Sequence, residues 1–358
     1  MRHLLQRYGN RIIKKLTVPA GALILFLSFS CRKNLYPDQP TDNELVILAE
    51  ITAGDSLKIP VSKSIQVGSG GIISFEEVSS ASVLVSRSSD GRSWKLRLNT
   101  SPDFAGNPAS VYTGPQKPHY NTTYNLQVQD PLSGTVTAKT TIPSPVLVSR
   151  LDTSGDSRYG APALKCQFTL TDSPGVSHYY VFEAVKQLVR LSHYFYWKGV
   201  RYNYDKPDGK KLYEQVKNVP GVKLSTDTLP SNIFKRLSIF TDDPNVDNAQ
   251  ESSLDSPFRR IFLPGTVVSG QSYTTSFSID RKYFRADNDS SLGRVLVQVK
   301  SVSTELYNYL FWYEKYKSDI GSVPPGQLYS PPGNIQNGLG IFGGSAKREW
   351  VFYFDSLL

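Results

Sequence analysis

The stretch VLVSRSSDGRSWKLRL at positions 83–98 indicates the fold class of this chain. Apolar residues occupy alternate positions before and after Asp90-Gly91, which is the period of a half-buried β-strand. Asp-Gly between two such runs favours a β-hairpin, because the tight primed turn requires positive φ angles. The stretch therefore predicts two antiparallel strands joined at Asp90-Gly91.

The same alternation continues on both sides of this hairpin. It is present at 45–51, at 124–128 and at 136–140. About seven or eight short strands within residues 44–143 are typical of an immunoglobulin-like β-sandwich. In that fold Tyr124 is a candidate for the tyrosine corner. We expect this domain to end at the proline-rich boundary near position 143.

A larger, β-rich C-terminal domain is predicted over residues 144–358, because strand-like runs again dominate the sequence. One amphipathic helix is predicted at about 304–320, with Thr304 as its N-cap and Gly321 as its end. Its apolar face is formed by Leu306, Tyr309, Leu310, Tyr313 and Ile320. The expected fold class is therefore mainly β, with a single helix.

The first 30 residues have the pattern of a secretory signal. Five Lys and Arg residues and no Asp or Glu precede Cys31, and the run 18–29 is almost purely apolar. This run is too short to span a bilayer, which requires roughly 20 apolar residues. Ser30-Cys31 resembles the end of a lipobox. We therefore expect a lipoprotein signal peptide at 1–30, lipidation of Cys31, a leash at 31–43 and attachment to a membrane through the lipid.

The net charge of +9 is largely a property of the signal segment. After Cys31 the chain has 35 basic and 31 acidic residues, a net of +4. Since these charges look dispersed along the sequence, and nucleic-acid binders concentrate theirs, we expect no nucleic-acid partner.

Cysteine and histidine are too few for most metal or disulfide chemistry. Acylated Cys31 leaves Cys166 without a partner in the chain, so an intrachain disulfide is excluded and Cys166 is expected to be a buried, small apolar residue. No histidine pair has zinc-ligand spacing, and the acidic loop 242–256 lacks the EF-hand pattern. We expect no metal and no cofactor.

Two motifs match enzyme signatures, but the sequence elements that each signature requires around it are missing. Gly54-Asp55-Ser56-Leu57 matches an esterase nucleophile block, but the chain has no Asp-x-x-His near its C-terminus. The glycines at 338, 340 and 343 match a dinucleotide fingerprint, but a strand is predicted next where the fingerprint needs a helix. A tight, glycine-rich turn or bulge beside a strand is expected instead. We therefore assign no catalytic residue and expect that the protein is not an enzyme.

The segment 191–204 is unusually aromatic. Its candidate surface residues are Tyr194, Tyr196, Trp197 and Tyr202. Aromatic residues of this density pack in β cores, dominate protein interfaces or stack on sugar rings. The sequence leaves these three alternatives open.

The C-terminal motifs resemble one bacterial lipoprotein family, domain of unknown function 4249 of the Bacteroidota. The resemblance rests on four motifs and on their order along the chain, which is SGQSY at 269–273, ELYNYL at 305–310, LYSPPGNI at 328–335 and NGLGIFG at 337–343. It extends from the lipobox over nearly all of the mature chain, and the family has no established catalytic residues.

The resemblance implies a cell-envelope, outer-membrane lipoprotein that is an accessory partner of a TonB-dependent receptor. It leaves open whether the protein faces the periplasm or the outside. The alternative is an independent glycan- or peptide-binding lipoprotein.

Overall fold

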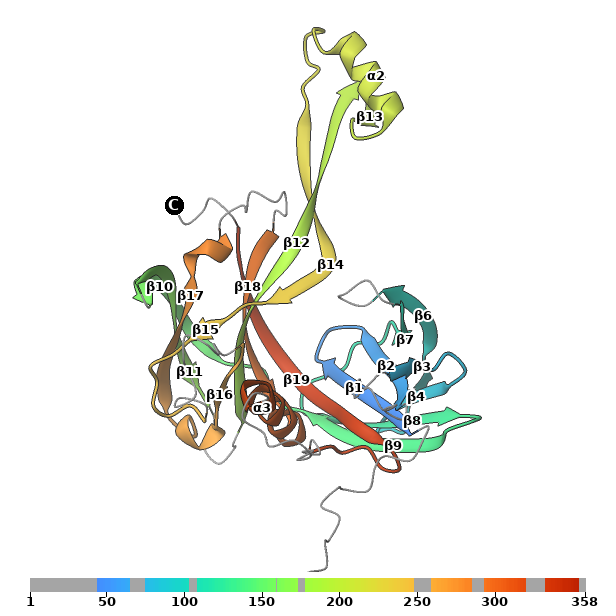
Figure 1. Cartoon of the computed structure of the whole chain (residues 1–358), viewed down its shortest axis with the longest axis vertical. Helices are drawn as coiled ribbons and strands as arrows, with labels where there is room; N and C mark the ends of the chain where they lie inside the picture. Colours follow the sequence, from blue (N-terminus) through green and yellow to red (C-terminus); the bar gives the residue numbers. More distant parts are fainter. Residues whose placement is uncertain are drawn as a thin grey trace, which may run out of the picture. The chain divides into compact units, whose positions relative to one another are not determined.

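A computed structural model describes residues 44–64, 75–102, 108–158, 160–172, 178–247, 259–284, 293–319 and 332–353. The fold is mainly β, as the sequence predicts (Figure 1). The predicted signal peptide at 1–30, the lipidation site Cys31 and the leash at 31–43 lie outside the described residues.

The first hydrophobic core is built mainly from strands between residues 45 and 142. They are β1 (Leu45–Thr52), β2 (Leu57–Ser64), β3 (Phe75–Glu77), β4 (Ser82–Arg87), β5 (Ser93–Lys95), β6 (Arg97–Pro102), β7 (Pro108–Gly114), β8 (Thr122–Asp130) and β9 (Gly134–Ile142). β1, β2, β7 and β6 are neighbours in one sheet, and β5, β4, β8 and β9 form another. Buried side chains from both sheets meet in this core.

The predicted hairpin is present, with a longer turn than predicted. β4 pairs with β5 through Val85 and Trp94. Gly91 has a φ of 69°, but Asp90 is not among the described residues with positive φ. The Arg87 carbonyl accepts a hydrogen bond from the Gly91 N–H at 3.0 Å. A two-residue primed turn is therefore the wrong turn type, and only the glycine supplies the positive φ.

Tyr124 lies at the start of β8 and is buried. Its hydroxyl accepts a hydrogen bond from the backbone N–H of His119, five residues earlier, at 2.9 Å. This is the contact expected of a tyrosine corner. The immunoglobulin-like connectivity and the domain limits at 44–143 and 144–358 stay predictions.

The second core is formed by the middle of the chain. Its strands are β10 (Val148–Arg158), β11 (Ala161–Thr171), β12 (Tyr179–Trp197), β14 (Ser225–Arg236), β15 (Ile239–Phe240), β16 (Ile261–Leu263), β17 (Ser272–Asp280) and β18 (Gly293–Val302), with 3-10 turns at Gly265–Val267 and Arg281–Phe284. Phe168 packs against Phe182 and Phe277, with ring centroids 5.5 and 5.4 Å apart. These rings join the sheet of β10, β11, β17 and β15 to the sheet that contains β12 and β18.

The last strand, β19 (Leu339–Phe352), connects the two cores. It pairs in parallel with β1, from Val46 opposite Leu339 to Thr52 opposite Ser345, and antiparallel with β18. Its residues Phe342 and Ala346 are buried in the first core. An eleven-stranded sheet therefore runs through both halves of the described chain.

Glycines in β19 allow this close packing. Gly340 has a φ of 105°, and a Cβ atom there would lie 2.0 Å from the carbonyl oxygen of Ile47 on β1. A Cβ atom on Gly343 would lie 2.6 Å from the Leu306 side chain. Gly340 and Gly343 lie inside β19 itself, whereas the sequence predicted a glycine-rich turn or bulge beside a strand, and the dinucleotide-loop context is absent from this described segment.

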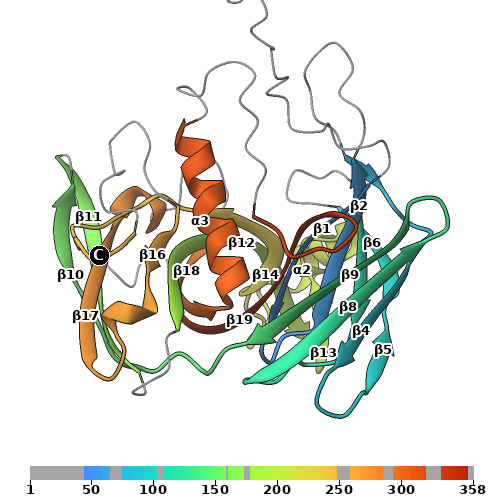
Figure 2. The same ribbon diagram turned by 90° about the horizontal axis from the view of Figure 1, so that it is seen from below.

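The predicted helix is α3 (Thr304–Asp319), which lies over β12 and β18 in Figure 2. Leu306, Tyr307 and Leu310 pack into a third apolar cluster with Val302 and Ile341. The hydroxyl of Ser303 accepts a hydrogen bond from the Leu306 N–H at 3.4 Å. The N-cap is therefore Ser303, one residue before the predicted Thr304.

Candidate functional site

The long strand β12 carries the aromatic segment away from the second core. Its first half pairs with β18 as far as Leu188 opposite Gly293. Beyond that point its described partners are β14 and the short strand β13 (Val200–Asn203). Figure 1 shows these three strands ending beneath a helix, α2 (Pro207–Val216). We call residues 193–224 the tip.

The sequence reading missed α2, although its signals are present. Pro207 stands in the first turn, where its fixed φ and missing N–H are tolerated, and Asp208 follows it. Gly209 is buried, and a Cβ atom there would lie 1.8 Å from the carbonyl oxygen of Asn203. A glycine normally weakens a helix prediction, but here it permits the close contact between helix and strand.

One face of the tip forms a small aromatic core under α2. Phe195 is fully buried and stacks on Tyr202, with ring centroids 5.6 Å apart. Tyr213 of α2 meets Phe195 at 5.1 Å and Tyr204 at 5.2 Å. These contacts hold the helix on the ribbon.

The opposite face of the tip presents an aromatic pair, of which Tyr196 is exposed and Tyr194 is half-buried. Tyr194 and Tyr196 alternate with Phe195 along β12, so they point to the other side of the ribbon. Their rings lie 5.8 Å apart, and Tyr196 is 54% exposed. The guanidinium of Arg201 lies 3.9 Å from the centroid of the Tyr194 ring and forms an ion pair with Asp227. We call Tyr194, Tyr196 and Arg201 the outer face.

The four residues proposed from the sequence are therefore divided between two faces. Tyr194 and Tyr196 lie on the outer face, whereas Tyr202 packs in the aromatic core of the tip. Trp197 is partly exposed next to the turn, and the Lys198 ammonium lies 5.4 Å from its ring. Their role in binding stays a prediction.

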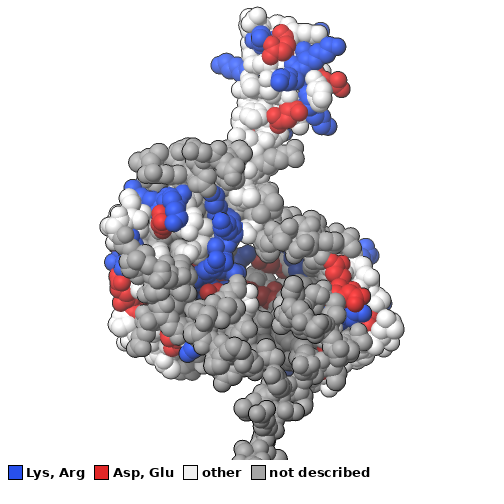
Figure 3. All heavy atoms as spheres, in the orientation of Figure 1, with Lys and Arg blue, Asp and Glu red and all other residues white. Residues whose placement is uncertain are grey.

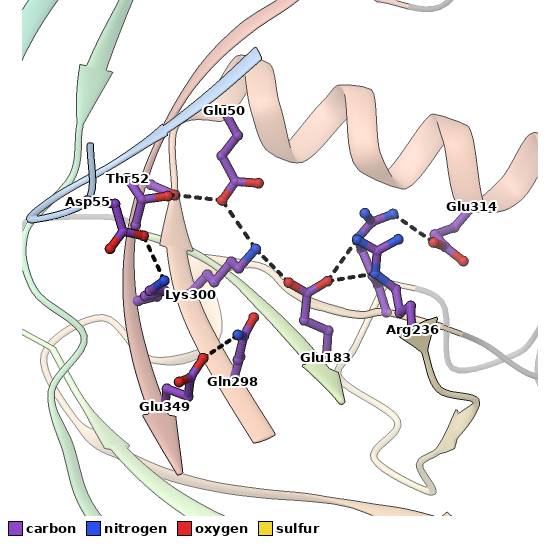
Figure 4. Close-up of polar contacts among 12 residues, drawn as sticks. Glu50, Thr52, Asp55, Glu183, Arg236, Gln298, Lys300, Glu314 and Glu349 are labelled. Carbon is purple, nitrogen blue, oxygen red and sulfur yellow. Dashed lines mark hydrogen bonds and ion pairs between the residues drawn. The ribbon is translucent and has the colours of Figure 1, made fainter. Parts of the chain in front are cut away.

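Apart from the tip, a cluster of charged side chains lies within the large sheet (Figure 4). Glu183 of β12 is buried and contacts three cations, namely Lys300 at 2.5 Å, Arg236 at 2.9 Å and Arg260 at 3.4 Å. Lys300 also pairs with Glu50 of β1 at 3.2 Å. The cluster thus ties β1, β12, β14 and β18 together.

The carboxylates of this cluster are held in their charged form. Burial raises the pKa of Glu183, but the charges of Lys300, Arg236 and Arg260 outweigh it, so the pKa lies far below its usual range. Burial also raises the pKa of Glu50, but the charge of Lys300 outweighs it, so the pKa of Glu50 is lowered. The pKa of Lys300 is raised, because the two carboxylates outweigh its burial. Groups that stay charged at neutral pH are poor proton donors or acceptors, so this cluster fits a structural role.

Two aspartate–histidine pairs were not found from the sequence. Nδ1 of His178 lies 2.9 Å from both oxygens of Asp172, and Nδ1 of His193 lies 2.8 Å from Asp205. Their spacings of six and twelve residues match no motif, so only the fold reveals them. His178 also lines a pocket of about 430 Å³ with Asn121, Lys139 and residues 302–305.

Cys166 is buried in β11, as predicted, and burial raises the pKa of its thiol to about 12. Within the described ranges no group of three or more His, Cys, Asp or Glu side chains is arranged to hold a metal ion. No α-helix in the same ranges has the length and apolar character needed to cross a bilayer.

These features define a β-rich protein with a helix-capped hairpin tip and a buried ionic cluster. The chain belongs to the family described as Domain of unknown function (DUF4249), whose profile matches residues 33–350. No curated protein matches the chain.

One solved structure is described as "Complete structure of manganese lipoxygenase of Gaeumannomyces graminis and partial structure of zonadhesin of Komagataella pastoris". It is 10% identical, with 87% of this chain and 94% of that chain covered, and its TM-score of 0.17 carries no argument.

Proposed function

We propose that this protein is a lipid-anchored component of the cell envelope that binds a protein partner through the outer face of its tip. The partner we propose is a TonB-dependent outer-membrane receptor, to which the chain is an accessory subunit rather than an enzyme. The anchor rests on the signal pattern before Cys31, and the receptor rests on the family resemblance. The partly exposed Tyr194–Tyr196 pair beside Arg201 is the observation that carries the binding role.

The composition of the outer face suits a protein interface. Tyrosine and arginine are enriched among the residues that dominate binding energy, whereas lysine and glutamate are depleted in interfaces relative to the rest of the surface. Arg201 is held between the Tyr194 ring and the Asp227 carboxylate. A side chain that is already ordered loses less entropy when a partner binds.

The alternative, an independent glycan-binding protein, requires aromatic rings that form one platform. Tyr194 and Tyr196 share one side of the ribbon, but their ring planes stand at 87° to each other, and Trp197, as the next residue of the strand, points to the other side. This arrangement favours the protein partner.

The test is cross-linking in the native envelope followed by purification of the tagged chain. We expect a TonB-dependent receptor in the wild-type sample, less of it with Cys31→Ala, and at least a tenfold loss with Tyr196→Ala combined with Arg201→Ala. Lys58→Ala is the matched surface control. If the receptor is absent from the wild-type sample, the proposal is wrong. Binding of purified chain to glycans would then favour the alternative.

A further inference from the structure

The tip accounts for the whole net positive charge of the chain after Cys31, which is +4. Residues 193–224 include seven basic and three acidic residues, whereas the chain after Cys31 has 35 and 31. The remaining positions therefore have 28 of each sign. The charge that looked dispersed in the sequence is concentrated on one hairpin end, and Figure 3 shows basic side chains spread over it.

Lysines of α2 and its flanks make up most of this charge. Lys206, Lys210 and Lys217 recur at helical spacing along one side of the helix, and Lys211 is close to them. All four side chains are exposed. Because α2 covers the aromatic core of Phe195 and Tyr202, these lysines lie on the opposite side of the ribbon from the outer face.

The kind of cation indicates the kind of partner. Six of the seven basic residues in the tip are lysines, and Arg201 is the seventh. Lysine is depleted in protein interfaces, where arginine is enriched. Lysine is a compact charge on a flexible stem, which suits headgroup phosphates whose positions are not fixed.

Apolar side chains accompany the lysines. Val200, Val219 and Leu224 are 51%, 38% and 40% exposed. Aliphatic side chains among lysines are the composition of segments that rest in a membrane interface, where apolar groups enter and ammonium groups stay at the phosphates.

We infer that the α2 side of the tip binds an anionic lipid surface. Each lysine near such a surface strengthens binding about fivefold. A basic surface is a second attachment beside the expected N-terminal lipid, and two attachments together hold a protein far more firmly than one. The outer face remains free for the protein partner, so the two contacts are separate.

The test uses the full mature chain with Cys31→Ala, which removes the lipid, and sedimentation with vesicles. One vesicle type is pure phosphatidylcholine and the other contains a third phosphatidylglycerol. We expect binding to the anionic vesicles only, with loss at high salt and no competition from millimolar inorganic phosphate. Lys210→Ala with Lys211→Ala should weaken binding about 25-fold, whereas Lys210→Arg with Lys211→Arg should retain it.

Lys58→Ala with Lys95→Ala is the matched control, because it removes two exposed lysines outside the tip. A dye on Val200→Cys should report an apolar environment with anionic vesicles, and one on Val351→Cys should not. Equal binding to both vesicle types, no binding, or equal losses in the tip and control variants would overturn the inference. Binding to an acidic protein but not to vesicles would also overturn it. Receptor binding is tested with variants of Tyr196 and Arg201, and lipid binding with variants of Lys210 and Lys211. Failure of the proposed function can therefore be told apart from failure of this inference.

Discussion

The carboxylate of Glu183 on β12 meets the ammonium of Lys300 on the neighbouring strand β18 at 2.5 Å, at a position where Glu183 is 2% exposed. Such a buried anion is tolerated only because several cations surround it. The pair therefore marks a place where removal of one carboxylate takes a shared partner from several cations.

Glu183→Gln should destabilise the protein strongly. It leaves Lys300, Arg236 and Arg260 without their shared partner, and breaking a buried ion pair costs about 3–5 kcal/mol. Chemical denaturation of the mature chain measures the change. Glu76→Gln, which breaks the exposed pair of Lys63 and Glu76 at 3.1 Å, should cost less than about 1 kcal/mol. Equal losses in the two variants would contradict this account of the cluster.

Stability should fall as the pH is lowered below about 4.3, the ordinary pKa of glutamate. The folded-state pKa values of Glu183 and Glu50 are lowered, so their contribution is complete above that pH and is lost as the pH falls toward the folded-state values. Denaturation midpoints between pH 7 and pH 3 test this. The slope should be shallower in Glu183→Gln, and an unchanged slope would argue against the assignment.

Gly340→Ala should be one of the most damaging small substitutions in β19. The φ of 105° strains an alanine, and its Cβ atom would lie 2.0 Å from a backbone oxygen of β1. We expect a loss of more than about 2 kcal/mol in the free energy of unfolding. Gly155→Ala is the control, because its Cβ atom would meet only the Arg281 side chain, at 3.7 Å.

Tyr196→Ala and Tyr202→Ala should separate binding from local folding. Tyr196 is largely exposed, so its loss should weaken partner binding and leave the tip folded. Tyr202 stacks on Phe195, so its loss should loosen α2. Amide hydrogen exchange over 193–224 distinguishes the two, and faster exchange in Tyr196→Ala would contradict the assignment of faces.

Cys166 should report global unfolding in the Cys31→Ala chain. Its thiol is fully buried, and burial raises its pKa to about 12, so a thiol reagent at pH 8 should not react with it. Addition of denaturant should make it react fully. Rapid reaction without denaturant would show that β11 opens locally.

Local patterns in the sequence predicted local structure well. The run at 124–128 and its return at 136–140 are the paired strands β8 and β9, with Tyr124 opposite Thr140. The apolar spacing at 306 and 310 located α3. α2 was missed because Gly209 weakens the helical pattern. A glycine is required there by close contact with the backbone of a residue in another element, which the local sequence does not reveal.

Pairings between distant residues had no signal in the sequence. Nothing near Glu50 or Lys300 indicates that the two meet, since they are brought together by β1, β19 and β18 lying side by side. The split of Tyr194 and Tyr202 onto two faces likewise needed the position of β13. The composition shows that aromatic residues are concentrated in this segment, but it does not show to which side of the ribbon each side chain points.

The parallel pairing of β1 with β19 also constrains how the chain reaches its native state. The first core cannot close until a strand encoded almost 300 residues later has been delivered, and contacts of such long sequence separation slow folding. During synthesis the early strands therefore lack part of their hydrophobic core until β19 has been made. Export of the unfolded chain, which we propose from the segment before Cys31, would benefit from that delay.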